Sequence, residues 1–430
     1  MFGEEESPCA MLSSKINFSP GAKNWIPKYF QLVDQGFLSY NEDFGNEDSI
    51  HPLRFILNKT GLLYGSVSQL IYSVKLDSKH FTKDEKLKLL LFEALIFVYR
   101  KNVKEFNENE FLSALGEFYG DSELNQFEHW LNYFSEKTIE SKIEKILADR
   151  VKVKTAIFGT NYWLNHLSNS FVFLDVILFD QFLKKETSSF FESYQSYSFV
   201  TLKCLIFVAY LDQQVEEKEQ RLLWHFLASA DLDKEQKQFC EKAIIEGISE
   251  NSLGYETMSD SLMKTLIFEL SIFVSKGTHF LSKKEEDKII AFAKKLTLSD
   301  TDVQLAFMLC NSYLLENADE IALLKSESNT QFVYKSFSKR WYKILGRNKE
   351  KLIHELKESK ELVSLIQKST KEELTKEEKE LVKNQFLDIL KSMPSMAIFL
   401  LPGGGFLLPL ILKIVPDLLP SSFKENEVEK

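Results

Sequence analysis

Histidines and cysteines are the side chains of this sequence that most often do chemistry, and their spacing groups none of them together. The cysteines form no Cys-x-x-Cys pair, which argues against a zinc site and is typical of a reducing compartment. The His-Trp pairs at positions 129–130 and 224–225 lie in helical sequence, and we interpret them as core or interface residues. The dispersed residues are Cys9, Cys204, Cys240, Cys310, His51, His80, His129, His166, His225, His279 and His354.

Sequence motifs for catalysis are also missing. The sequence has no His-Glu-x-x-His, P-loop, Gly-x-Ser-x-Gly or dinucleotide-binding fingerprint. Gly403, Gly404 and Gly405 form a run, but apolar residues flank it and no Lys-Ser/Thr pair is near, so it is no phosphate loop. Acid pairs at 216–217 and 285–286 stand at expected helix starts, where they complement the helix dipole. We therefore predict no catalytic residue, no cofactor, no metal site and no enzyme.

Net charge and composition narrow the class of protein further. The chain has 430 residues and a net charge of −10, which argues against a general nucleic-acid surface. The N-terminus lacks the basic and long apolar regions of a signal peptide, so we expect the bulk of the chain in the cytoplasm. Only 16 Gly and 9 Pro are present, which favours ordered helices over a loop-rich chain.

The elements that hold these residues are expected to be helices almost throughout. From about residue 84, apolar residues recur at three and four positions with charges between them. Three apolar helices end in Ile-Phe-Val, at 96–98, 206–208 and 272–274, and each is followed by a short link and an acid-led helix. We predict an all-α, multi-helix bundle with repeated helix-turn-helix units. Chance similarity between amphipathic helices is the alternative, since the copies lie 110 and 66 residues apart.

Composition divides the chain into six expected segments. Residues 1–80 form an aromatic-rich segment, interpreted as irregular up to about residue 75, with Trp25, Tyr29 and Phe30. A helical unit follows at 81–185, a second helical region at 186–340 and charged amphipathic helices at 341–391. A hydrophobic segment at 392–423 precedes a polar tail at 424–430.

Residues 207–236 resemble the TerB-like helical family of tellurite-resistance proteins. The resemblance is carried by an apolar helix, a turn at Asp212 and an acid-led helix containing Glu219, although Gln213 replaces the glycine of that family's turn. The departure puts in doubt any metal role for these two acids, and a protein-interaction module remains the simpler expectation.

A capping box begins the last charged helix. Thr375 and Glu378 have the spacing at which each side chain satisfies a free backbone N–H at a helix start. The helix that follows places Leu381, Val382, Phe386 and Leu390 on one face. We expect a solvated amphipathic helix leading to a membrane, with the docking of a partner helix as the alternative.

The hydrophobic segment is the strongest feature of the sequence. Residues 393–412 are 20 residues without a charge, which is long enough to cross about 30 Å of hydrocarbon as a helix. Its prolines and glycines break a straight helix, so a kinked span, a re-entrant hairpin and packing against the protein's own helices remain alternatives. The candidate membrane residues are Pro394, Pro402, Gly403, Gly404, Gly405, Pro409, Lys413, Pro416, Asp417 and Pro420.

Residues 374–423 resemble the membrane region of the leucine-zipper, EF-hand-containing transmembrane (LETM-type) proteins. The matching pattern is a charged helix, an apolar stretch and a proline-punctuated end in which Pro409, Lys413 and Pro416 keep the family's register. The resemblance implies an inner-membrane protein of cation homeostasis, with proton-linked exchange and a ribosome-associated region. In its organisation the chain also resembles the bacterial LETM-related biofilm-associated proteins.

The sequence departs from that family in ways that redirect the expected function. It has no EF-hand, and Gly405 stands where the family commonly has an acid, although an ion path needs a titratable group. Ribosome binding is not expected, because the family's downstream domain is not found after Phe423.

We therefore predict a scaffold or tether at the cytoplasmic face of the bacterial inner membrane, with a role in cation or membrane homeostasis and biofilm physiology. Its expected partners are the lipid bilayer and either other proteins or a second copy of the chain. The alternatives are a subunit of a proton-linked exchanger and a soluble TerB-like module with a buried C-terminal end.

Overall fold

The computed structural model is helical throughout the part of the chain that it describes, in agreement with the predicted all-α class. The described residues are 18–40, 51–74, 76–120, 138–152, 169–187, 189–211, 215, 217–276, 282–317, 327–347, 349–369, 372–392, 408 and 411–416. They form two compact units. The first comprises Met1–Glu42 and Ile56–Thr297, and the second comprises Asp43–Phe55 and Leu298–Lys430, so that the boundary between them falls inside one helix.

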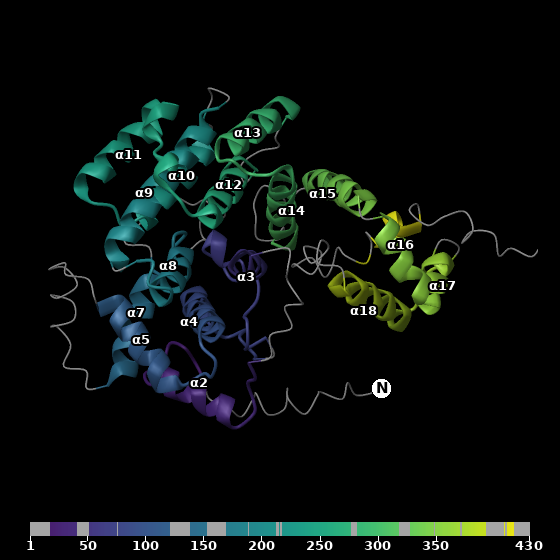
Figure 1. The fold of residues 1–430 in the computed structure, drawn as a ribbon, viewed down its shortest axis with the longest axis horizontal. Coiled ribbons are helices and arrows are strands. Elements are labelled where there is room, and N and C mark those ends of the chain that lie inside the picture. Colours follow the sequence, from purple (N-terminus) through teal and green to yellow (C-terminus); the bar gives the residue numbers. More distant parts are fainter. Residues whose placement is uncertain are drawn as a thin grey trace, which may run out of the picture. The chain divides into compact units, whose positions relative to one another are not determined.

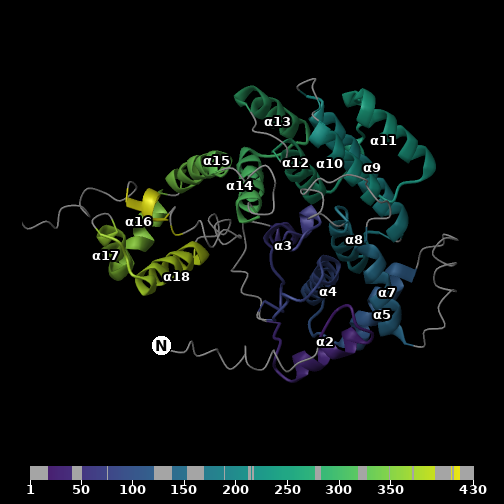
Figure 2. The same ribbon diagram turned by 180° about the vertical axis from the view of Figure 1, so that it is seen from behind.

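The first unit is built around four largely buried helices. Its helices are α2 (Trp25–Asp34), α3 (Pro52–Thr60, shared with the second unit), α4 (Lys83–Asn102), α5 (Glu108–Gly120), α7 (Ile139–Arg150), α8 (Phe173–Leu183), α9 (Phe190–Ala209), α10 (Glu217–Ser229), α11 (Lys234–Glu246), α12 (Ser261–Lys276) and α13 (Lys283–Lys295), with short 3-10 turns at Leu62–Tyr64, Glu250–Ser252 and Tyr255–Thr257. Helix α4 packs against α8, α8 against α9 and α9 against α12, and both ribbon views show this succession (Figures 1 and 2).

The three predicted helix pairs are present as α4–α5, α9–α10 and α12–α13. Each Ile-Phe-Val triplet lies in the buried part of its first helix, apart from the half-buried Phe207. A further likeness emerges three residues before each triplet, where Glu93, Lys203 and Glu269 are all buried charged residues. The recurrence of a costly buried charge at one register position favours duplication over chance similarity.

The expectation of an irregular N-terminal segment is wrong where Trp25–Asp34 form helix α2 and Pro52–Thr60 form α3. The aromatic residues of α2 gather on one face and are buried, with the Trp25 and Tyr29 ring centroids 5.1 and 5.4 Å from that of Phe92. The carboxylate of Glu144 accepts hydrogen bonds from the backbone N–H groups of Asn24 and Ile26 at 3.0 and 2.9 Å. The cap of α2 therefore comes from a distant helix, and no local signal announces it.

The second unit carries α14 (Asp300–Glu316), α15 (Glu327–Arg347), α16 (Lys349–Glu358), α17 (Lys360–Lys368) and α18 (Lys376–Ser392). The predicted capping box at the start of α18 is confirmed, with Glu378 N–H donating to Thr375 Oγ1 at 3.2 Å and Thr375 N–H donating to Glu378 Oε2 at 2.9 Å. Val382, Phe386 and Leu390 are fully buried, and α18 packs against α16 and α17. The apolar face of α18 thus belongs to the core of this unit, and the expected solvated helix is corrected.

Among the residues that the structure describes, no helix is both long enough and apolar enough to cross a bilayer. Most of the uncharged stretch at 393–412 lies outside those residues, which include only Leu408, Ile411 and Leu412 from it. The predicted membrane segment therefore stays a prediction.

Candidate functional site

The structure describes only some of the candidate residues that the sequence suggested. Glu219 lies in the first turn of α10 and is 2% exposed, whereas its proposed companion Asp212 is outside the described residues. In the hydrophobic segment, Lys413 is exposed and Pro416 half-buried within a helical stretch at 411–416. The remaining candidates lie outside the described part of the chain, namely Pro394, Pro402, Gly403, Gly404, Gly405, Pro409, Asp417 and Pro420.

The described end of the hydrophobic segment is buried in the second unit. Ile411 and Val415 are 0% exposed and Ile414 is 4% exposed, and their spacing places them on one face of the helical turn. The Lys413 ammonium lies 5.9 Å from the ring centroid of Tyr334 in α15, where it makes a cation–π contact. The C-terminal end of the apolar stretch therefore lies against the second unit, with Lys413 beside α15.

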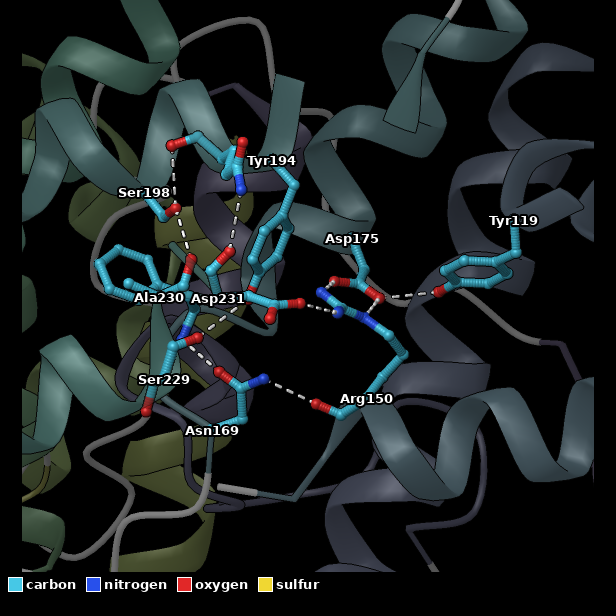
Figure 3. A network of polar contacts seen from close by, with 11 residues as sticks. Tyr119, Arg150, Asn169, Asp175, Tyr194, Ser198, Ser229, Ala230 and Asp231 are labelled. Atoms are coloured by element: carbon cyan, nitrogen blue, oxygen red, sulfur yellow. Dashed lines mark hydrogen bonds and ion pairs between the residues drawn. The ribbon is translucent and has the colours of Figure 1, made fainter. Parts of the chain in front are cut away.

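A buried network of charged and polar side chains lies in the first unit, and Figure 3 shows it. The Arg150 guanidinium at the end of α7 donates two hydrogen bonds to the Asp175 carboxylate of α8, from Nε to Oδ2 and from Nη2 to Oδ1, both at 2.8 Å. The hydroxyl of Tyr119 in α5 donates to Oδ2 at 2.8 Å. Burial and the Asp175 charge raise the pKa of Tyr119 well above its ordinary value, which keeps this hydroxyl a donor.

Aromatic rings and a turn close the network on the other side of the guanidinium. The Arg150 guanidinium carbon lies 4.3 Å from the ring centroid of Tyr194 and 5.0 Å from that of Phe190, both in α9. Asp231 approaches to 3.9 Å and takes a left-handed conformation (φ 53°) directly after α10. Asn169 donates to the Arg150 carbonyl at 2.7 Å (Figure 3). Four other stretches of chain therefore gather around one arginine and its partner Asp175.

The chemistry of this network is stabilisation of the fold. Asp175 is fully buried and both of its oxygens accept hydrogen bonds from protein donors, so the carboxylate is not accessible to a substrate. No group of three or more potential metal ligands is found among the described residues. The arrangement is a charge-paired and hydrogen-bonded lock between α5, α7, α8 and α9.

Neighbouring groups that could be nucleophiles are buried as well. His225 Nε2 and Ser170 Oγ are 3.0 Å apart, but these residues are 3% and 0% exposed, so the pair is a core contact, in agreement with the prediction for His225. Burial raises the pKa of the Cys204 and Cys240 thiols to about 12, which keeps both protonated and unreactive.

A second buried acid holds the first unit together by a different means. Glu93 of α4 accepts hydrogen bonds from three consecutive backbone N–H groups, those of Ile71, Tyr72 and Ser73, at 2.7, 3.0 and 3.0 Å. The Ser73 and Tyr29 hydroxyls also donate to it. Burial raises the pKa of Glu93, whereas the hydrogen bonds from Ser73 and its neighbours act in the opposite direction. The carboxylate fastens the preceding loop to α4.

Sequence reasoning did not single out Glu93, Arg150, Lys203 or Asp175. A signal was available for three of them, because each is a lone charge inside an otherwise apolar helical run. A charge in such a position must find a partner, since burying it alone is costly. Arg150 gave no such signal, because it ends a helix of ordinary amphipathic composition.

An open groove of about 730 Å³ lies at the ends of α4 and α8. Its walls mix aromatic, acidic and basic side chains, and they converge on no reactive group. The groove is lined by Tyr99, Asn102, Val103, Ala114, Glu117, Phe182, Leu183, Lys185, Glu186 and Thr187.

Comparison with known proteins bears on the second unit. Residues 374–430 match the model of a family described as "LETM1-like, RBD". This segment is LETM1-like. The match spans α18, the uncharged stretch and the docked turn at 411–416, so the LETM1-like segment combines core residues of the second unit with the candidate membrane residues. The family's description names an RBD and does not name a membrane segment. The expectation that this chain does not bind ribosomes stays a prediction. No curated protein and no solved structure matches the chain.

Proposed function

We propose that this protein is a helical scaffold that its LETM1-like segment attaches to the cytoplasmic face of the bacterial inner membrane. The observation that carries the proposal is the uncharged stretch at 393–412 inside the LETM1-like segment. Lys391 and Lys413 bracket it, and long cationic side chains at such positions reach the aqueous interface while their stems stay in apolar surroundings.

The rest of the chain serves as the interaction part in this proposal. The first unit, with its repeated helix pairs and TerB-like region, binds protein partners or a second copy of the chain. The physiological setting is cation or membrane homeostasis, including biofilm growth. Attachment is favoured over ion exchange because the uncharged stretch offers no titratable group.

Charge insertion tests attachment without shortening the chain. In the double variant Ile398→Lys, Leu407→Lys, two cations enter the uncharged stretch, each costing roughly 2.5–3.5 kcal/mol at the centre of a bilayer. We expect the wild type to sediment with membranes and resist a carbonate wash, and the variant to be released. The matched control is Phe239→Lys, Ile245→Lys, since these side chains of α11 are 42% and 63% exposed and the two cations fall in the first unit. Equal sedimentation of all three proteins would refute attachment through this stretch.

A second candidate function is a soluble interaction module whose C-terminal end is buried. The burial of Ile411, Ile414 and Val415 in the second unit favours it. In that case the wild type remains in the supernatant, and charges within 393–412 lower the stability of the second unit.

A further inference from the structure

The docked turn at 411–416 and the uncharged stretch share residues. Ile411 and Leu412 are the last two residues of the stretch, and Ile411 is also 0% exposed in the second unit. One side chain cannot lie in the core of a helical unit and in a bilayer at the same time. Docking and full insertion of the stretch therefore exclude each other at Ile411.

We propose that the docked turn is an autoinhibitory contact, which holds the end of the apolar stretch on the second unit until a lipid surface takes its place. The inference rests on the proposed membrane attachment and adds its regulation. The chain then has a closed state, with the turn docked against α15, and an open state, with Ile411 and the stretch before it in lipid.

The balance between these states is close because lipid and protein offer similar surroundings to aliphatic side chains. Lipid tails are as apolar as a leucine-rich core, so moving Ile411 and its neighbours between the two changes their hydrophobic burial little. Contacts specific to the docked state decide the balance. One of them is the cation–π contact of the Lys413 ammonium with the Tyr334 ring, and the burial of Val415 is another.

Two substitutions weaken docking while leaving residues 393–412 unchanged. Tyr334→Lys removes the ring and places a cation beside Lys413. Val415→Asn puts a polar group into a fully buried site beyond the uncharged stretch. Tyr342→Lys is the matched control, since it makes the same change in α15 at a side chain that is 46% exposed.

Flotation of the full-length proteins with vesicles of mixed zwitterionic and anionic lipid tests the proposal. At lipid concentrations that leave part of the wild type unbound, we expect Tyr334→Lys and Val415→Asn to raise the association constant for vesicles about five- to tenfold, which corresponds to about 1–1.4 kcal/mol, and Tyr342→Lys to change it little. Hydrogen exchange of the wild-type amides at 411–416 should become faster when vesicles are added and the turn leaves the second unit, which requires no substitution.

The outcomes separate this inference from the proposed function. Wild-type binding that neither docking variant raises above the Tyr342→Lys control, with exchange at 411–416 unchanged by vesicles, overturns the autoinhibitory contact and leaves membrane attachment standing. Binding by the docking variants alone supports the autoinhibitory contact and contradicts the expected attachment of the wild type. An absence of binding by all of the proteins overturns the proposed function and the inference together.

Discussion

Replacing Asp175 by asparagine should destabilise the first unit strongly, because the change leaves the Arg150 guanidinium buried without its main counter-charge. Asp175 is 0% exposed and Arg150 is 7% exposed, and two hydrogen bonds of 2.8 Å join them. Breaking a buried ion pair on one side costs about 3–5 kcal/mol. Asp231 lies 3.9 Å from the guanidinium and supplies part of the lost compensation, so we expect a loss near the lower end, about 3 kcal/mol.

Urea unfolding followed by circular dichroism measures this loss, and hydrogen exchange in α7 and α8 assigns it to the first unit. Tyr119→Phe is the control, since it removes one hydrogen bond to the same carboxylate but no charge, at a cost of about 1 kcal/mol. The paired change Arg150→Met, Asp175→Leu should cost less than Asp175→Asn alone, because it removes both charges. If Asp175→Asn costs no more than Tyr119→Phe, the network does not act as a charge-paired lock.

Three further substitutions test other parts of the described structure. Burial raises the pKa of Glu316 to about 8, so the folded state holds this proton more tightly than the unfolded state does. As the pH rises from about 5 to about 8, the wild type should therefore lose stability relative to Glu316→Gln, by at most about 1.4 kcal/mol per pH unit. Urea unfolding at a series of pH values measures this loss. Gly65→Ala should cost more than about 2 kcal/mol in thermal unfolding, because φ is +66° and the added Cβ would lie 2.8 Å from Ser170 Cα. The control is Gly120→Ala in α5, where the added Cβ meets nothing within 4 Å, so this change should be neutral or stabilising in the same assay. Glu93→Gln should cost about 2–3 kcal/mol in urea unfolding and speed amide exchange at 71–73, because an amide nitrogen would face backbone donors; unchanged exchange there would contradict the proposed role of Glu93 in fastening the loop.

The sequence predicted the start of those helices that are capped by residues only three positions apart. Ser282 and Thr375 each stand three residues before a glutamate, and both capping boxes form as the spacing indicates. The three apolar helices that contain Ile-Phe-Val were equally clear, since their composition alone demands burial, although each helix continues beyond its triplet.

Long-range contacts account for what the sequence could not show. Helix α2 is capped by Glu144 from 118 residues away at Ile26, and the lock joins Arg150 of α7 to Asp175 of α8. An acidic residue in an apolar run indicates that it has a buried partner, but only the three-dimensional structure shows which residue that partner is. The same limit applies to α18, whose apolar face could equally have met solvent, a partner helix or its own unit.

The position of α18 changes how membrane attachment has to be tested. Val382 and Phe386 are core residues of the second unit, and the Phe386 ring centroid lies 6.2 Å from that of Trp341. Deleting the whole LETM1-like segment would remove α18 and expose that core, and deleting only residues 393–430 would still remove the buried Ile411 and Val415. A truncated chain could thus leave membranes through loss of its anchor or bind them through exposed core surface. Charged substitutions within 393–407 remove no described core residue, because α18 and the docked turn keep their own side chains.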